Sequence, residues 1–284
     1  MKIYICTISF RHHLLSLEEL VSWAAATGFD GIELWGAHAR NLVQDHRDAR
    51  WLAGHALEVP MISDYLPLDD PLQLEAHALH LVHAATRWGA GKVRTFAGRT
   101  SNKETSSEAR KAIVAGLSRA ARIFDNEGLS LLVETHPGTL ADSLAATSAL
   151  VAEVDHPALG VNFDAIHLWE AGDDPLEAHR LLAPRIRHHH LKNVARRSDL
   201  PVFAPDNIYN AAGCRRGIVP LLEGAYDYRP LLGTLARDQE CPVSLEWFGR
   251  DPFHVLAEDC RRLREITGPA AQTEPLHHPL RQQA

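Results

Sequence analysis

The chain has 284 residues, of which 45% are apolar and 23% charged, as is typical of a globular protein. Its formal net charge of −7 argues against a nucleic-acid-binding surface, which is usually basic. No stretch approaches the roughly 18 consecutive apolar residues of a membrane span. The apolar start, residues 1–8, has no small-residue cleavage site after it, so we expect a first strand there and not a signal peptide. Four widely spaced cysteines predict no disulfide framework and fit a cytoplasmic, reducing compartment.

Short apolar runs alternate with longer helical segments along the whole chain. The expected strands are Lys2–Ile8, Gly31–Trp35, Val59–Tyr65, Lys92–Phe96, Ser130–His136, Gly160–Asp164, Ile186–Asn193 and Pro242–Phe248. The expected helices run from the Ser16 cap to the Gly28 stop and over 46–57, 71–88, 106–126, 143–153, 175–183, 229–238 and 252–266. Eight strand–helix units predict a (β/α)8 TIM barrel, one domain over residues 1–268. A doubly wound sheet is the alternative, but no glycine-rich turn follows the first strand.

Two segments fall outside this alternation. Residues 195–228 are rich in Pro and Gly and have no clear periodicity, and a long irregular segment inside a compact domain is often an active-site cover. Residues 269–284 hold three prolines and no apolar periodicity, which predicts a disordered tail.

The carboxyl ends of barrel strands are where catalytic groups of this fold lie. Because side chains alternate along a strand, four successive strands can each direct an ionisable group to the barrel axis: Glu134, Asp164, His190 and Glu246. Three carboxylates would repel one another unless a cation joined them. Three oxygen donors and one imidazole suit Mn²⁺ or Mg²⁺, with Co²⁺ or Zn²⁺ as alternatives. Separate polar residues at the strand ends are the structural alternative.

Other strand-end residues are weaker candidates. His136 and Lys192 each stand two residues beyond a predicted ligand and could act as general acid or base, with a pKa lowered by the metal. Arg94 suits an anionic substrate, unless it forms an ion pair with another strand end such as Glu33. His167 could hydrogen-bond a ligand or substrate.

For two tyrosines and two histidines, a purely structural role is the alternative to a role in the site. Tyr65 and Tyr209 can supply hydroxyls, although core packing is the commoner fate of Tyr. His188 is expected one layer deeper than the site, buried and hydrogen-bonded without a chemical role. His189 is expected to face the helices.

Several blocks of sequence together resemble one bacterial enzyme family. They are Thr7-Ile8-Ser9-Phe10-Arg11-His12, Gly31-Ile32-Glu33-Leu34-Trp35-Gly36, Ile62-Ser63-Asp64-Tyr65-Leu66, Val93-Arg94-Thr95-Phe96-Ala97-Gly98, Glu134-Thr135-His136-Pro137, His190-Leu191-Lys192-Asn193, Asn207-Ile208-Tyr209 and Ser244-Leu245-Glu246-Trp247-Phe248-Gly249. From about residue 1 to 266 the chain resembles 3-dehydroshikimate dehydratases of the petrobactin siderophore type, which belong to the xylose-isomerase-like TIM-barrel superfamily. The fit is poorer around 201–206, and His189 stands where an aromatic residue is expected.

The resemblance implies metal-dependent loss of water from 3-dehydroshikimate to give protocatechuate. It implies metal ligation by Glu134, Asp164, His190 and Glu246, with Mn²⁺ as the first expectation. It also implies substrate-contacting or catalytic roles for His136, Lys192, Arg94, Tyr65, His167 and Tyr209. We expect His136 to be the base in the first place and Lys192 in the second, and Arg94 or Lys192 to hold the substrate carboxylate.

Two other functions compete with this interpretation. A sugar or cyclitol isomerase or epimerase would use the same four ligands, with Glu134 and Glu246 doubling as acid and base. A small-molecule sensor would bind without turnover, but it has no need of a base. The sequence does not determine the native metal, the oligomeric state, or whether the product serves siderophore assembly or aromatic catabolism.

Overall fold

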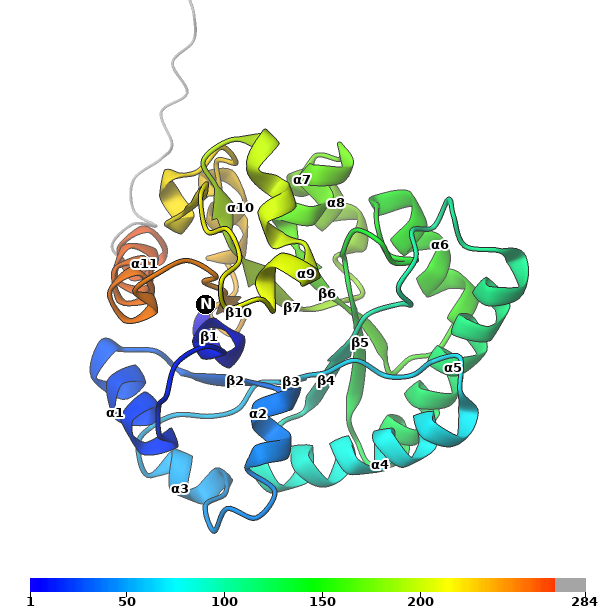
Figure 1. Cartoon of the computed structure of the whole chain (residues 1–284), viewed down its shortest axis with the longest axis horizontal. Helices are drawn as coiled ribbons and strands as arrows, with labels where there is room; N and C mark the ends of the chain where they lie inside the picture. The colour runs from blue at the N-terminus through cyan, green and yellow to red at the C-terminus, as the bar shows by residue number, and fades with distance from the viewer. Residues whose placement is uncertain (269–284) are drawn as a thin grey trace, which may run out of the picture.

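The barrel expected from the sequence is present. A computed structural model describes residues 1–268, so the predicted tail at 269–284 lies outside the described residues. Eight parallel strands form a closed barrel in the order β1-β10-β7-β6-β5-β4-β3-β2, and the helices lie outside this ring (Figure 1). The fold class is therefore confirmed as a (β/α)8 barrel.

Every predicted strand is present, and most end earlier than expected. The barrel strands are β1 (Lys2–Cys6), β2 (Gly31–Trp35), β3 (Ile62–Ser63), β4 (Lys92–Thr95), β5 (Ser130–Glu134), β6 (Leu159–Asp164), β7 (Ile186–Leu191) and β10 (Pro242–Leu245). The largest difference is β3, because Pro60 has no backbone N–H to give to a neighbouring strand. After β1 the chain turns at once into the 3-10 helix η1 (Thr7–Phe10).

Seven helices follow the predicted ranges, and side chains cap the first turns of all of them except α10. They are α1 (Leu17–Thr27), α4 (Pro71–Trp88), α5 (Ser107–Asn126), α6 (Leu144–Val154), α8 (Pro175–Leu182), α10 (Arg229–Leu235) and α11 (Pro252–Thr267), with α3 (Ala49–Ala53) shorter than expected. Asp70, Asp174 and Asp251 each cap a helix that starts with proline. The sequence analysis missed α2 (Gly36–Asn41) and α7 (Ala165–Ala171), which directly follow strand ends and are too short to show a helical period.

The irregular segment after β7 forms a cover, as expected. A two-stranded antiparallel sheet, β8 (Asn193–Val194) with β9 (Ile218–Val219), closes its base. Between these strands lie η2 (Arg197–Phe203) and α9 (Pro205–Ile208), and η3 (Leu221–Glu223) follows. The segment packs an apolar cluster of its own onto the strand ends, formed by Leu200, Val202, Phe203 and Ile208 with Cys6, Ile8, Ile166, Val194 and Phe248. This cluster places the cover over the carboxyl ends of β1, β6 and β10.

Two glycines in helices test how tightly the outer layer packs. A Cβ at Gly116 of α5 would collide with the carbonyl oxygen of Leu68, whereas a Cβ at Gly233 of α10 would meet nothing within 4 Å. We expect Gly116→Ala to lower the free energy of unfolding by about 1–3 kcal/mol, because the backbone at Leu68 must move. The matched change Gly233→Ala should raise it by about 0.5–1 kcal/mol. Urea unfolding measures both changes in the free energy of unfolding. Changes of the same sign in the two variants would contradict the packing described.

Candidate active site

The strand ends and the cover enclose a small pocket. Its lining residues are Ile8, Tyr65, Arg94, Phe96, Glu134, His136, His167, Lys192, Phe203, Pro205, Ile208, Tyr209, Glu246 and Phe248. Eight of the ten site residues expected from the sequence are among them. The other two, Asp164 and His190, are fully buried and contact the lining: Asp164 pairs with Lys192, and His190 lies 3.5 Å from Glu134. All ten therefore belong to one site.

Strand register brings the acidic groups and His190 together. In the barrel, His190 of β7 is level with Asp164 of β6 and with Ser244 of β10. Asp164 also caps α7, because one of its carboxylate oxygens accepts the N–H of Ile166 at 3.2 Å. The cap holds the Asp164 carboxylate at the strand end and leaves its second oxygen to face the site.

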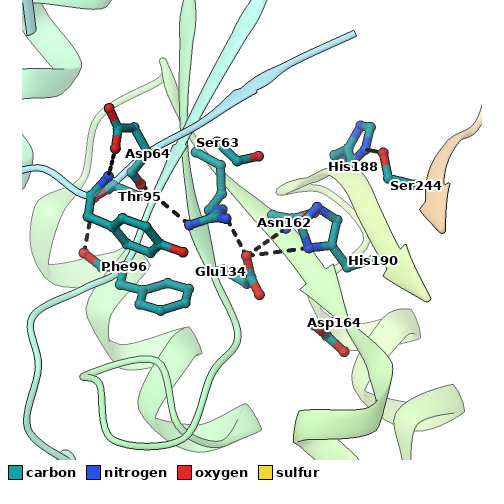
Figure 2. Close-up of polar contacts among 12 residues, drawn as sticks. Ser63, Asp64, Thr95, Phe96, Glu134, Asn162, Asp164, His188, His190 and Ser244 are labelled. Carbon is teal, nitrogen blue, oxygen red and sulfur yellow. Dashed lines mark hydrogen bonds and ion pairs between the residues drawn. The ribbon is translucent and has the colours of Figure 1, made fainter. Parts of the chain in front are cut away.

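Glu134 is held by three nitrogen groups that approach one of its oxygens. Its Oε2 lies 2.9 Å from Nε of Arg94, accepts from Nδ2 of Asn162 at 3.2 Å, and lies 3.5 Å from Nδ1 of His190. In Figure 2, dashed lines join the Glu134 carboxylate to Asn162 and His190, which lie on the same side of it. These contacts leave Oε1 of Glu134 without a partner among the described residues, so this oxygen is available to a ligand.

His190 has the arrangement of a metal ligand. Its Nε2 lies 3.0 Å from both carboxylate oxygens of Glu33. Its buried Nδ1 has no hydrogen-bond partner among the described residues, and lies 3.4 Å from Oε1 of Glu246. When Nε2 donates to a carboxylate, Nδ1 presents a lone pair, which is how metal-binding histidines are oriented. Donor atoms of Glu134, Asp164 and His190 all lie within 4.8 Å of one another, and the carboxylate of Glu246 lies beside this group.

The charge balance also favours a cation at this point. Four buried carboxylates face two buried cations: Glu33, Glu134, Asp164 and Glu246 against Arg94 and Lys192. With His190 neutral, two negative charges are left over. A divalent cation would balance them, and uncompensated buried charge is costly.

The excess negative charge is visible in two pKa values. Burial raises the pKa of Asp164 to about 7, and Glu134 and Glu246 add to this rise against the opposing charge of Lys192. Burial alone would lower the pKa of His190, but the surrounding glutamates outweigh it and hold this pKa well above its ordinary value. An acid and a base thus both favour their protonated forms, which is the signature of a site that attracts positive charge.

His136 has the properties of a neutral base. Its Nδ1 lies 2.7 Å from the carbonyl oxygen of Pro137, which can only accept, so Nδ1 carries the proton and Nε2 has the lone pair. Burial, with a smaller contribution from His167, lowers the pKa of His136 to about 3. The ring stacks on Phe96 at a centroid distance of 4.3 Å, which fixes its plane. The direction of the pKa shift agrees with expectation, although burial causes it here.

Lys192 pairs with two carboxylates of the site. Its ammonium contacts Asp164 and lies 2.7 Å from Oε2 of Glu246. Burial would lower the pKa of Lys192, but these two carboxylates outweigh burial and raise it. Lys192 is therefore an ammonium in this charge environment and can hold an anion; the lowering of its pKa by a bound metal stays a prediction.

Arg94 forms the ion pair with another strand end that was the alternative to an anion-binding role. Its partner is Glu134 and not Glu33. The rings of Tyr65 and Phe96 cover its guanidinium, with centroids 5.0 and 4.9 Å from Cζ. Arg94 therefore orients Glu134 as well as lining the pocket.

Two hydroxyls and one histidine complete the wall. The hydroxyl oxygens of Tyr65 and Tyr209 lie 2.7 Å apart, which joins the loop after β3 to the cover. Nδ1 of His167 lies 2.9 Å from a carboxylate oxygen of Glu170, and its buried Nε2 has no hydrogen-bond partner among the described residues. His167 can therefore accept a hydrogen bond through Nε2 from a bound molecule.

His188 and His189 lie where the sequence predicts them. His188 is fully buried, and its Nε2 lies 2.7 Å from Oγ of Ser244. His189 stacks on His179 of α8, so it faces the helices.

Sequence analysis missed Glu33 and Asn162 as parts of the site. Glu33 contacts His190, which is 157 residues away, and Asn162 binds Glu134. The signal for Glu33 was its place near the carboxyl end of a predicted strand, where it was considered only as a partner of Arg94. Asn162 lies in the same strand as Asp164 but carries no charge, so its residue type gives no signal of an ionisable site.

A closed barrel with carboxylates and an imidazole at the strand ends defines a class of metal-site TIM barrels. The chain belongs to the xylose isomerase-like TIM barrel family, whose model matches residues 21–266. A curated relative, the 3-dehydroshikimate dehydratase of Bacillus anthracis, is 40% identical over 271 residues, which are 93% of this chain and 96% of the relative. The resemblance inferred from the sequence motifs is thereby confirmed.

Solved structures agree with this assignment. The probable 3-DHS dehydratase AsbF involved in petrobactin synthesis from Bacillus anthracis matches with a TM-score of 0.89 and 40% identity, over 93% of this chain and 98% of that chain. The IolI protein with a bound zinc atom matches with a TM-score of 0.72 and 17% identity, over 94% and 96% of the two chains, and shows the common fold. No helix among residues 1–268 is long and apolar enough to cross a bilayer.

The geometry predicts different effects on Mn²⁺ binding for two buried histidines of the site, His190 and His136. We expect His190→Asn to weaken Mn²⁺ binding by at least about a hundredfold, because it removes the Nδ1 donor. His136→Asn should leave Mn²⁺ affinity within about threefold of the parent chain, because His136 is outside the donor set. Titration of free Mn²⁺ by electron paramagnetic resonance measures both. An equal loss of Mn²⁺ affinity in the two variants would contradict the assignment of His190, and not His136, as a metal donor.

Proposed function

We propose that this chain is a 3-dehydroshikimate dehydratase that converts 3-dehydroshikimate to protocatechuate and water. The single observation that carries the proposal is the nearly full-length 40% identity to the Bacillus anthracis enzyme. The pocket supports it, because it combines a neutral imidazole, buried cations and a set of metal donors. Loss of one water from the substrate yields the aromatic product without oxidation or reduction, so the reaction needs no redox cofactor.

We propose that Glu134, Asp164, His190 and Glu246 hold the divalent cation, and that Mn²⁺ is the native ion. Three carboxylates and one imidazole suit Mn²⁺, with Mg²⁺ and Co²⁺ as alternatives. A bound cation supplies Lewis acidity that stabilises negative charge developing on the substrate carbonyl oxygen. The unpartnered Nδ1 of His190 and the excess of buried carboxylates over Arg94 and Lys192 support this assignment.

His136 is the proposed base of the reaction. Its Nε2 has the free lone pair and takes the proton from the carbon next to the ketone. The imidazolium then returns this proton to the departing β-hydroxyl, which leaves as water. A tautomeric shift of the remaining ring gives the catechol, and aromatisation drives the reaction forward.

The other pocket residues orient the substrate. Lys192 and Arg94 are the cations on which the substrate carboxylate can rest, and we favour Lys192 because Glu134 already engages Arg94. Nε2 of His167 accepts a hydrogen bond from a substrate hydroxyl. The Tyr65 and Tyr209 hydroxyls close the pocket above the ring and exclude water.

Cellular context is part of the same proposal. All four cysteines are unpaired, which supports a reducing cytoplasm. The described relative takes part in petrobactin synthesis, and this favours siderophore assembly over aromatic catabolism as the use of the product.

The first experiment tests reaction and metal together. Chelator-treated protein is supplied with Mn²⁺ and 3-dehydroshikimate, and near-ultraviolet absorbance follows formation of the catechol. We expect product only when the metal is restored, because the carbonyl charge is otherwise unstabilised. Bound Mn²⁺ without product would refute the dehydratase and direct attention to ketose and cyclitol substrates.

A second prediction concerns His136 alone. His136→Ala should lower kcat by about 10²–10⁴-fold, the usual contribution of a positioned base, while Mn²⁺ affinity stays near that of the parent. His189→Ala is the control, because this neighbouring buried histidine faces the helices. Retention of full turnover by His136→Ala would assign the base elsewhere.

A further inference from the structure

Glu33 is a fully buried carboxylate beneath the site, and the mechanism above gives it no role. It lies in β2 with no exposed surface. Its oxygens lie 3.0 Å from Nε2 of His190 and 3.3 Å from Nε2 of His188, and one of them accepts the hydroxyl of Ser63. A buried carboxylate with this many partners is held in one orientation.

The position of Glu33 determines which nitrogen of His190 carries the proton. A neutral imidazole holds one ring proton, on either nitrogen, and hydrogen bonding decides which. Without Glu33, Nδ1 could carry the proton and donate it to Glu134 or Glu246, 3.5 and 3.4 Å away. The ring would then present a hydrogen to the cation where the site requires a lone pair.

We propose that Glu33 is a positioning residue of the metal site. It accepts the Nε2 proton of His190 and thereby keeps the Nδ1 lone pair directed to the site. Ser63, from the neighbouring strand β3, keeps the Glu33 carboxylate from rotating away. This inference rests on the proposed metal site and is independent of which substrate the pocket takes.

A merely structural role for Glu33 is the competing explanation. Glu33 would then serve only to satisfy buried polar groups such as His188. Figure 2 shows that His188 also pairs with Ser244, at 2.7 Å. Ser244→Ala therefore perturbs His188 without touching the Nε2 atom of His190, and it is the matched control.

The test measures Mn²⁺ affinity in Glu33→Gln, Glu33→Ala and Ser244→Ala, by the paramagnetic resonance signal of free Mn²⁺. We expect a 10–100-fold weaker affinity for Glu33→Ala, the usual effect of removing such a partner. Glu33→Gln should lose less, because its amide oxygen can still accept the Nε2 proton. Ser244→Ala should bind as the parent chain does.

Ring nitrogen shifts of ¹⁵N-histidine in the Zn²⁺-loaded proteins provide a second measurement. The parent chain should show a single His190 form protonated at Nε2, and Glu33→Ala a mixture or a lost ligand. Folded Glu33→Gln and Glu33→Ala proteins with parental Mn²⁺ affinity would overturn the inference, whatever the protein's activity. Equal losses in Ser244→Ala would do the same, because they would show a general effect of the buried network.

Discussion

The structure depends on the burial of like charges at one end of the barrel. Four carboxylates from β2, β5, β6 and the segment after β10 meet out of water, where Arg94 and Lys192 balance part of their charge. Such an arrangement is costly unless a cation joins it. The charge of the surroundings therefore determines the state of each neighbour: Lys192 stays an ammonium and Asp164 retains its proton more strongly than an exposed aspartate.

His190 and His136 differ in the groups that determine which ring nitrogen carries a proton. His190 lies between Glu33 on one side and Glu134 and Glu246 on the other, so carboxylates control both of its nitrogens. His136 is held by a backbone carbonyl and an aromatic ring, away from direct contact with the acids. One histidine is thereby suited to hold a cation and the other to exchange a proton, although both belong to one small site.

The cover over the carboxyl ends of the strands shields the site from solvent. The strand ends alone would leave the pocket open to solvent. Phe203, Pro205, Ile208 and Tyr209 from the cover form part of the pocket wall, and the Tyr65–Tyr209 hydroxyl contact connects the cover to the barrel. Water excluded by this cover would otherwise weaken every electrostatic interaction inside.

The sequence by itself determined the barrel and most of the helices, and it predicted the four residues proposed as metal donors. Strand period, proline and aspartate caps, and the rule that function lies at strand ends are local patterns, so they can be recognised without coordinates. Only the tertiary structure decided which side chains of the site contact one another. Glu33 and His190 are 157 residues apart, and Arg94 meets Glu134 and not Glu33, because barrel closure and register determine these contacts. The pKa of Lys192 likewise follows from charges on other strands, and no pattern along one strand reveals them.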